Sequence, residues 1–153
     1  MIYLNDLVYP INGVLKKLLQ SRFHGLASKG LMVISWSGRK TGKRFSTPVG
    51  YQLDGEAVVV LISKPAEKGW WKNFRSPWPA ELTLKGEELT MMGTVVSPDS
   101  SDFFRYCEDT LRQLPWMGSQ FGGIRYEADK GLDEGQKETL AEFVAIVRFE
   151  LPG

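Results

Sequence analysis

Residues 31–62 read LMVISWSGRKTGKRFSTPVGYQLDGEAVVVLI, and the predicted fold follows from this stretch. Its first six residues are an apolar run of strand length that ends before Ser37 and Gly38, where backbone freedom rises. Its last six residues, Ala57–Ile62, are apolar and mostly β-branched, which predicts a central strand buried on both faces. Asp54-Gly55, just before them, is a strong hairpin signal. The stretch therefore predicts a strand, a loop, a second strand, a turn and a third strand.

The loop between the first two strands is Gly38-Arg39-Lys40-Thr41-Gly42-Lys43-Arg44, with four cations within six positions. Its two glycines allow a tight turn that aims backbone N–H groups at one point, while the Arg and Lys side chains add positive charge around that point. The spacing matches neither a Walker A phosphate loop nor the Gly-x-Gly-x-x-Gly dinucleotide fingerprint. The loop suits an anion, and the alternative interpretation is a solvated basic hairpin loop.

Composition and charge indicate one domain over residues 1–153 and an anionic partner. The chain is 42% hydrophobic and 12% aromatic, enough for one real core. Its net charge of +1 hides an asymmetry, because residues 1–53 contain eight Lys or Arg and one acid, whereas residues 54–153 contain eleven Lys or Arg and seventeen acids. A charge distribution of this kind attracts anionic ligands to one face. Nucleic acid, an anionic membrane and a phosphorylated cofactor all fit.

Cysteine and histidine usage argues against a disulfide framework and against a metal site. Cys107 is the one cysteine and reads as a structural thiol, which suits a reducing compartment. His24 is the one histidine, so no His/Cys metal cluster can form. No apolar run reaches membrane-spanning length, and the N-terminus lacks a secretory pattern. We expect a cytoplasmic protein without a structural metal.

The flanking segments predict helices around a barrel. Residues 1–29 are expected to be a helical segment packing on the barrel, with an amphipathic helix from Pro10 to about Gly25 that could also lie on an anionic membrane. We further expect a short helix within 67–75, a hairpin of 80–84 with 87–96, helices over 102–114 and 133–142, and an alternating strand over 143–151. The fold class is therefore α+β, a small, mostly antiparallel barrel with peripheral helices.

The order of these features resembles the deazaflavin-dependent nitroreductase family, whose members have a split β-barrel related to flavin-binding oxidase folds. The family's Gly-Arg-Lys-Thr/Ser-Gly loop and following Thr/Asn-Pro strand correspond to Gly38–Gly42 and Thr47-Pro48. A strand ending in Ser-Lys and an aromatic pair leading to Asn correspond to Ser63-Lys64 and to Trp70-Trp71-Lys72-Asn73. The likeness in order and spacing covers about residues 31–96.

The resemblance implies that the protein binds coenzyme F-420, an 8-hydroxy deazaflavin whose tail carries a phosphate and a polyglutamate chain, with flavin mononucleotide (FMN) as the second choice. It implies hydride transfer from the reduced coenzyme to an electron-poor quinone, enone or nitro compound as the small-molecule redox substrate. The residues that it assigns to the tail are Arg39, Lys40, Thr41, Lys43, Ser63 and Lys64, and those that it assigns to the ring pocket are Pro48, Trp70 and Asn73. No catalytic residue is assigned, since Tyr51, Ser63, Tyr126 or solvent could each supply the proton.

Two other functional classes remain open at this point. The barrel could be non-catalytic, or could bind another flavin or an apolar anion. A nucleic-acid or membrane-surface module is the remaining class, although its cations would be interleaved with exposed aromatics, whereas here they cluster in one loop. We expect no nucleic-acid partner, peripheral membrane contact only through the N-terminal helix, and a monomer or homodimer.

Overall fold

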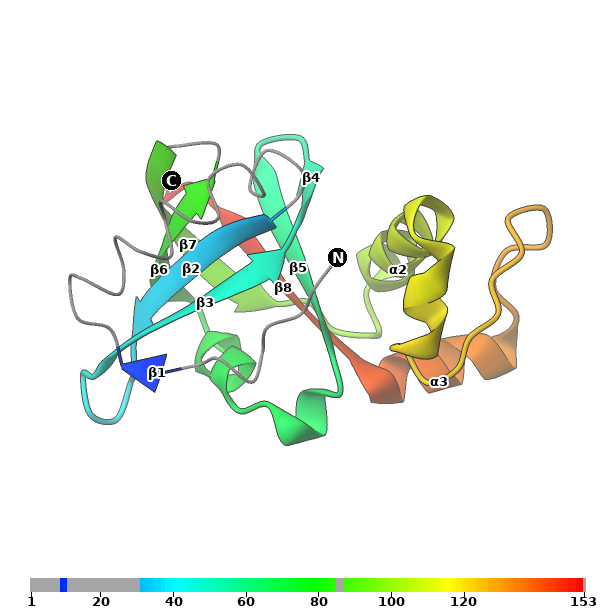
Figure 1. The fold of residues 1–153 in the computed structure, drawn as a ribbon, viewed down its shortest axis with the longest axis horizontal. Helices are drawn as coiled ribbons and strands as arrows, with labels where there is room; N and C mark the ends of the chain where they lie inside the picture. Colours follow the sequence, from blue (N-terminus) through cyan, green and yellow to red (C-terminus); the bar gives the residue numbers. More distant parts are fainter. Residues whose placement is uncertain (1–8, 11–30, 85–86, 153) are drawn as a thin grey trace.

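The computed structural model describes residues 9–10, 31–84 and 87–152. In this part of the chain, eight strands form one antiparallel sheet in the order β1-β3-β2-β6-β7-β8-β5-β4 (Figure 1). The strands are β1 (Tyr9–Pro10), β2 (Leu31–Ser37), β3 (Arg44–Gly50), β4 (Gln52–Asp54), β5 (Ala57–Ser63), β6 (Trp78–Leu84), β7 (Glu87–Val95) and β8 (Val144–Glu150). The expected hairpins β4–β5 and β6–β7 are both present.

The sheet curls into a barrel because β3 and β4, which are adjacent in sequence, lie at or next to opposite edges of the sheet. β3 lies next to last at one end of the strand order and β4 is the last strand at the other end, yet only Tyr51 separates them in sequence. The chain therefore bends at Tyr51 and carries the sheet round on itself (Figure 1). The predicted α+β class with a small antiparallel barrel is confirmed.

The barrel interior holds the first of two cores. Alternate residues of β2 point into it, namely Met32, Ile34 and Trp36. A 3-10 helix, η3 (Trp70–Phe74), contributes two aromatic rings to the same core: the Trp70 ring lies 5.4 Å from that of Trp36. These contacts tie the segment after β5 to the strands that flank the basic loop.

The second core lies between the sheet and two helices, α2 (Ser101–Gln113) and α3 (Glu134–Phe143). Val59 and Leu61 of β5 face these helices, while their neighbours in the strand face the barrel interior. The prediction that β5 is buried on both faces is confirmed. β8 is also buried on both faces from Val144 to Val147, which corrects the expected alternating strand, because helices cover its outer side.

Local capping explains where the helices begin. The Ser100 hydroxyl accepts a hydrogen bond from the backbone N–H of Asp102 and starts α2. Asp133 and Gln136 form a capping box that starts α3. Of these helices, none is long and apolar enough to span a membrane, nor is any other in the described part of the chain.

Two local expectations need correction. Pro10 is not the start of a helix, since it pairs with Phe45 as part of β1, a position where a residue without an N–H group is tolerated. The rest of the expected N-terminal helix lies outside the described residues, as does the Lys85-Gly86 turn. The short helix expected within 67–75 is η3, preceded by a separate 3-10 turn, η2 (Pro65–Glu67).

Candidate functional site

The basic loop between β2 and β3 is closed by its own backbone. The N–H of Gly38 donates to the carbonyl of Lys43 at 2.8 Å, and the N–H of Gly42 donates to the carbonyl of Gly38 at 2.9 Å. The N–H of Lys43 donates to the Thr41 hydroxyl at 3.3 Å. These three N–H groups therefore do not converge on an external point, contrary to the sequence expectation. An anion at this loop would be held by side chains.

Arg39 holds the loop against the segment that follows η3. Its Nε donates to the carbonyl of Asn73 at 2.8 Å, and one Nη donates to the carbonyls of Ser76 and Pro77 at 2.7 and 3.0 Å. The guanidinium also lies 4.2 Å from the centre of the Trp78 ring. This planar fork of donors fixes the direction in which the loop leaves the barrel.

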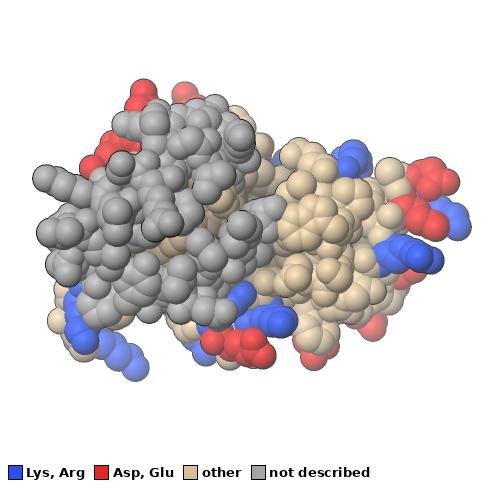
Figure 2. Space-filling model, in the orientation of Figure 1, with Lys and Arg blue, Asp and Glu red and all other residues tan. Residues whose placement is uncertain are grey.

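Lys40 and Lys43 extend from the same loop into solvent. Both residues are exposed, and neither ammonium group forms an ion pair with a described residue. Figure 2 shows the blue side chains of Lys and Arg at the lower left, where Figure 1 draws the loop. Among the described residues, these two loop cations have no ion-pair partner, whereas Arg44 pairs with Glu81.

Ser63 is the last residue of β5 and Lys64 follows it. β5 runs in the same direction as β2, so both residues lie at the barrel end that carries the basic loop. The Ser63 hydroxyl is buried and accepts a hydrogen bond from the ammonium of Lys68 at 3.2 Å. Lys64 is exposed and adopts the left-handed conformation with φ 51°, although it is not a glycine. A strained backbone of this kind is typical of functional positions.

The ring-pocket residues fall into two groups. Trp70 and Asn73 are on η3, and the backbone N–H of Arg39 donates to the Asn73 side chain at 3.4 Å, so the structure brings these three residues together. Pro48 is buried further along β3, opposite Val33 of β2, and is not part of that group. The structure therefore gathers eight of the nine predicted residues at one barrel end, with Pro48 set apart on the sheet.

Two indole N–H groups inside the barrel lack a hydrogen-bond partner among the residues that the structure describes. Trp36 and Trp70 are 1% and 5% exposed, and neither indole nitrogen has a hydrogen-bond partner in the described part of the chain. Buried donors are nearly always paired in folded proteins, so such exceptions call for an explanation. Trp70 belongs to η3, and Trp36 lies near the end of β2, just before the basic loop.

The three candidate proton donors have different surroundings. Tyr51 is half-buried at the bend between β3 and β4, and burial raises the pKa of its hydroxyl. Ser63 accepts from Lys68, as described above. Tyr126 lies against the second core, where its hydroxyl donates to Glu108 at 3.1 Å. No single one of them is favoured by position.

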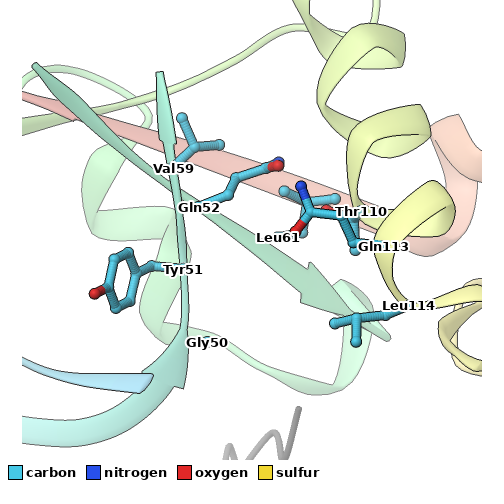
Figure 3. Close-up of a pocket in the computed structure, with 8 residues that line it drawn as sticks. All are labelled: Gly50, Tyr51, Gln52, Val59, Leu61, Thr110, Gln113 and Leu114. Atoms are coloured by element: carbon cyan, nitrogen blue, oxygen red, sulfur yellow. The ribbon is translucent and has the colours of Figure 1, made fainter. Parts of the chain in front are cut away.

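A pocket lies between the bend at Tyr51, strand β5 and helix α2 (Figure 3). Its volume is about 40 Å³. The residues that line it are Gly50, Tyr51, Gln52, Val59, Leu61, Thr110, Gln113 and Leu114. Sequence reasoning did not find this pocket, because its walls come from three separate segments.

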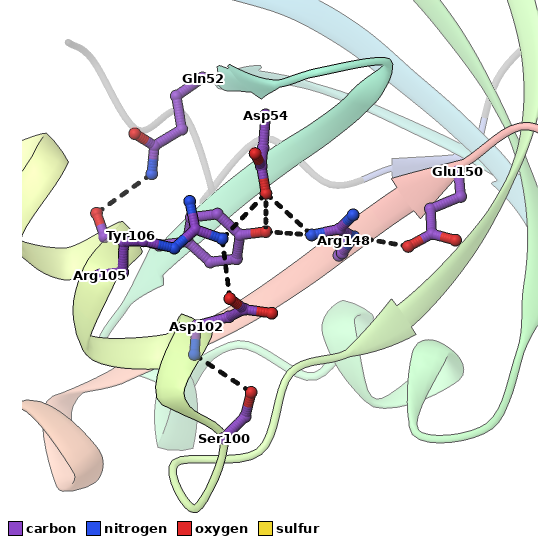
Figure 4. A network of polar contacts seen from close by, with 8 residues as sticks. All are labelled: Gln52, Asp54, Ser100, Asp102, Arg105, Tyr106, Arg148 and Glu150. Carbon is purple, nitrogen blue, oxygen red and sulfur yellow. Dashed lines mark hydrogen bonds and ion pairs between the residues drawn. The ribbon is translucent and has the colours of Figure 1, made fainter.

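Sequence reasoning also missed a polar network centred on Asp54 (Figure 4). One Asp54 oxygen accepts from the Tyr106 hydroxyl at 2.5 Å, from Arg148 at 2.9 Å and from Arg105 at 3.1 Å. The hydrogen bonds from Tyr106 and Arg105 lower the pKa of Asp54 to about 2. The only sequence signal at Asp54 was its hairpin turn, which says nothing of these partners.

Metal and thiol chemistry find no site in the described part of the chain. There, no group of three or more His, Cys, Asp or Glu side chains is arranged to hold a metal ion. Cys107 is buried, and burial raises the pKa of its thiol to about 12, so this thiol is not a poised nucleophile.

Comparison with solved structures identifies the fold. An F420-H2 dependent reductase (FDR-A) superposes with a TM-score of 0.56 at 10% identity, covering 80% of this chain and 95% of that chain. A putative pyridoxamine 5'-phosphate oxidase from Listeria innocua superposes with a TM-score of 0.52 at 11% identity, covering 86% and 92%. A chain described as a domain-swapped dimer gives 0.55 at 9% identity, covering 88% and 98%.

No protein-family model matches the sequence, and no curated protein sequence matches it either. The likeness is therefore one of fold. The class that the fold defines is the α+β split β-barrel, which this chain shares with an F420-H2 dependent reductase.

Proposed function

We propose that the protein is an oxidoreductase that uses reduced coenzyme F-420 to transfer a hydride to an electron-poor organic acceptor such as a quinone, an enone or a nitro compound. The split-barrel fold, shared with an F420-H2 dependent reductase, supports this proposal. So does the motif likeness over residues 31–96, which includes the basic loop and the Ser63-Lys64 strand end.

The observation that carries the proposal is the charge at one end of the barrel. Residues 38–43 and 64–75 contain seven Lys or Arg and one acid, Glu67. Arg39 joins the two segments through its hydrogen bonds to Asn73, Ser76 and Pro77. Such an excess of cations costs free energy unless an anion neutralises it. A tail carrying a phosphate and several carboxylates has the matching charge.

The residues present fit this coenzyme. Lys40, Lys43 and Lys64 are exposed and have no ion-pair partner among the described residues, so they would hold the anionic tail as point charges. Thr41 and Ser63 would add hydroxyl contacts, and Arg39 would position the loop as well as contribute charge. Trp70 and Asn73 would line the ring pocket, whereas Pro48, the third residue assigned to it, lies apart from them in β3. When bound, the coenzyme supplies the hydride, and the protein supplies orientation and exclusion of water.

FMN is the second candidate. Its single phosphate requires fewer cations than a polyglutamate tail, and the same lysines would serve it. Because the two ligands differ chiefly in the number of negative charges on the tail, a direct comparison of their affinities separates the two candidates.

The first test is a fluorescence titration of the purified protein with oxidised F-420, beside FMN. We expect F-420 to bind with a micromolar or lower Kd and FMN to bind more weakly. Reduced F-420 should then be consumed in the presence of menadione as the quinone acceptor. If the protein bound FMN more tightly, FMN would take the place of F-420 as the proposed cofactor. If it bound neither F-420 nor FMN, the proposal would be refuted.

The second test is the double variant Lys40→Ala/Lys43→Ala. Loss of two charge-assisted contacts should raise the Kd for F-420 at least about tenfold. The matched control is Arg125→Ala/Lys130→Ala, which removes two exposed cations from a segment beyond α2. An unchanged Kd in the loop variant would remove these lysines from the site. Circular dichroism should show that both variants fold, since exposed side chains contribute little to stability.

We infer a monomer or a homodimer for the assembly. The chain described as a domain-swapped dimer has the same fold, which supports testing the homodimer first. Size-exclusion chromatography with light scattering measures the mass directly, and a mass of about twice 17.3 kDa would indicate the homodimer.

A further inference from the structure

The pocket shown in Figure 3 is a small cavity with an apolar floor and polar walls. Val59 and Leu61 of β5 form the floor, and Leu114 closes one side. Gln52 and Gln113 are directed into the space between β4–β5 and α2, where Thr110 also lies (Figure 3). The walls are fixed, because the Gln52 amide nitrogen donates to the carbonyl of Tyr106 in α2 at 3.1 Å.

The pocket is lined by side-chain groups that have no hydrogen-bond partner among the described residues. Thr110 is 6% exposed, and its hydroxyl forms no hydrogen bond with any described residue. The side-chain amide of Gln113 and the amide oxygen of Gln52 have no partner in the described part of the chain either. These groups can therefore donate hydrogen bonds to a ligand in the pocket and accept hydrogen bonds from it.

None of the described residues that line the pocket is charged. The nearest charges on the same stretch of α2 are already paired, since Arg112 contacts Asp109 at 3.3 Å and Glu108 at 3.6 Å. An ion entering the pocket would lose its hydration without gaining a counter-charge, which is strongly unfavourable. The pocket therefore discriminates against charged groups.

We propose that this pocket binds the carboxamide or carbonyl end of an uncharged small molecule, with Thr110 and Gln113 as its hydrogen-bonding residues and Val59 and Leu61 as its apolar floor. A primary carboxamide pairs with a glutamine amide through one donor and one acceptor, and leaves a second N–H or oxygen for the threonine hydroxyl. The volume of about 40 Å³ has room for two or three atoms of this size, and the remainder of the molecule extends past Leu114.

This proposal does not depend on the coenzyme. The pocket is lined from the bend at Tyr51 and from α2, whereas the proposed coenzyme tail site is formed by the basic loop and the end of β5. If F-420 did not bind, the proposal for the pocket would be unaffected. If benzamide did not bind in the pocket, the proposal for F-420 would be unaffected.

The test uses benzamide as the probe and benzoate as its charged counterpart of nearly equal shape. Binding is followed by two-dimensional NMR of protein with labelled Leu, Val and Thr methyl groups. We expect benzamide to shift the methyl signals of Leu61, Leu114 and Thr110 in a saturable way at millimolar concentration. Benzoate should leave these signals unshifted, because none of the described lining residues carries a charge that would neutralise it. Equal effects of the two probes, or no saturable shift with benzamide, would overturn the proposal.

Single-residue variants distinguish a hydrogen bond between benzamide and the Thr110 hydroxyl from apolar contact with Val59 and Leu61. Thr110→Val keeps the shape of the side chain and should weaken benzamide binding by about threefold to tenfold, whereas Thr110→Ser should retain most of it. Gln113→Leu should weaken binding similarly, and Gln120→Leu, which changes an exposed residue outside the pocket, should not. Affinity unchanged in both Thr110→Val and Gln113→Leu would contradict the assignment. Because Gln113 is exposed, its variant tests the pocket even if Thr110→Val does not fold.

Discussion

Arg44 and Phe45 illustrate how one residue step in a strand changes the role of a side chain. The Phe45 ring stacks on that of Trp36, with ring centres 5.7 Å apart, and is packed against the barrel core. Arg44 points to the opposite face of β3, where it pairs with Glu81 at 3.1 Å. Its charge is therefore partly neutralised within the fold. The proposed grip on an anion rests on Lys40 and Lys43 instead.

Asp54 provides a prediction at the same scale. Its pKa of about 2 lies below the ordinary value of a carboxyl group, so ionised Asp54 stabilises the folded state above about pH 4. This contribution is lost as the pH falls from about 4 to about 2, because Tyr106, Arg105 and Arg148 then face a neutral group. As the pH falls from about 4 to about 2, the free energy of unfolding should decrease less in Asp54→Asn than in the wild type. Urea unfolding midpoints measured at each pH test this. Parallel curves for the two proteins would show that the network does not depend on ionised Asp54.

At the scale of elements, η3 is the piece that joins the site to the core. Phe74 of η3 meets Phe149 of β8 edge to face, with ring centres 5.3 Å apart. Trp70 of the same element lies beside Trp36 of β2, and Arg39 of the loop is hydrogen-bonded to Asn73. One short 3-10 helix therefore contacts the barrel wall on two sides and also sets the position of the basic loop.

A substitution at Gly93 of β7 tests how closely η3 packs against the barrel. A Cβ atom at this position would lie 2.6 Å from the Phe149 ring and 2.7 Å from the Phe74 ring, closer than atoms normally approach. Gly93→Ala should therefore lower the free energy of unfolding by about 1–3 kcal/mol, through displacement of the two rings. The measurement is urea unfolding followed by tryptophan fluorescence. As a control, Gly69→Ala introduces a Cβ with no atom within 4 Å, and should have a smaller effect. Equal losses in the two variants would argue against overpacking at Gly93.

At the scale of the whole molecule, charge is distributed unevenly between the barrel end and the rest of the chain. The cations of the basic loop and of residues 64–75 lie at one end of the barrel, whereas α2 and α3 carry acids that pair locally with their own cations. The neutral pocket between β4–β5 and α2 belongs to neither group. The two proposed sites should therefore respond differently to salt.

We expect the Kd for F-420 to rise as NaCl is increased from about 0.05 to about 0.5 M, because the Debye length shortens and the exposed lysines are screened. The Kd for benzamide, a neutral probe of the Figure 3 pocket, should stay nearly constant over the same range. Isothermal titration of both ligands under identical conditions measures the contrast. An F-420 affinity that is insensitive to salt would contradict a grip by exposed cations.

The sequence by itself determined the barrel class, the location of the basic loop, and strands β2 and β5 with helices α2 and α3. It did not predict that Pro10 belongs to a strand. Ala57–Ile62, Asp54-Gly55 and the helical pattern over 102–114 are local signals whose physical causes act over a few residues, and each prediction is confirmed. The N–H groups of Gly38 and Gly42 were misread, because the same turn can aim them outward or close them on the loop itself, and the residue types do not distinguish the two.

Only the tertiary structure decided which distant residues meet. Arg39 reaches a carbonyl 34 positions away, and Asp54 meets Tyr106 and Arg148 at separations of 52 and 94 positions. The pocket joins the bend at Tyr51 to α2 in the same way. Such contacts depend on the strand order, on the curl of the sheet and on how the helices dock, and no local pattern encodes these. The residues that could bind were visible in the sequence, whereas their grouping into a cationic barrel end and a separate neutral pocket was set by packing.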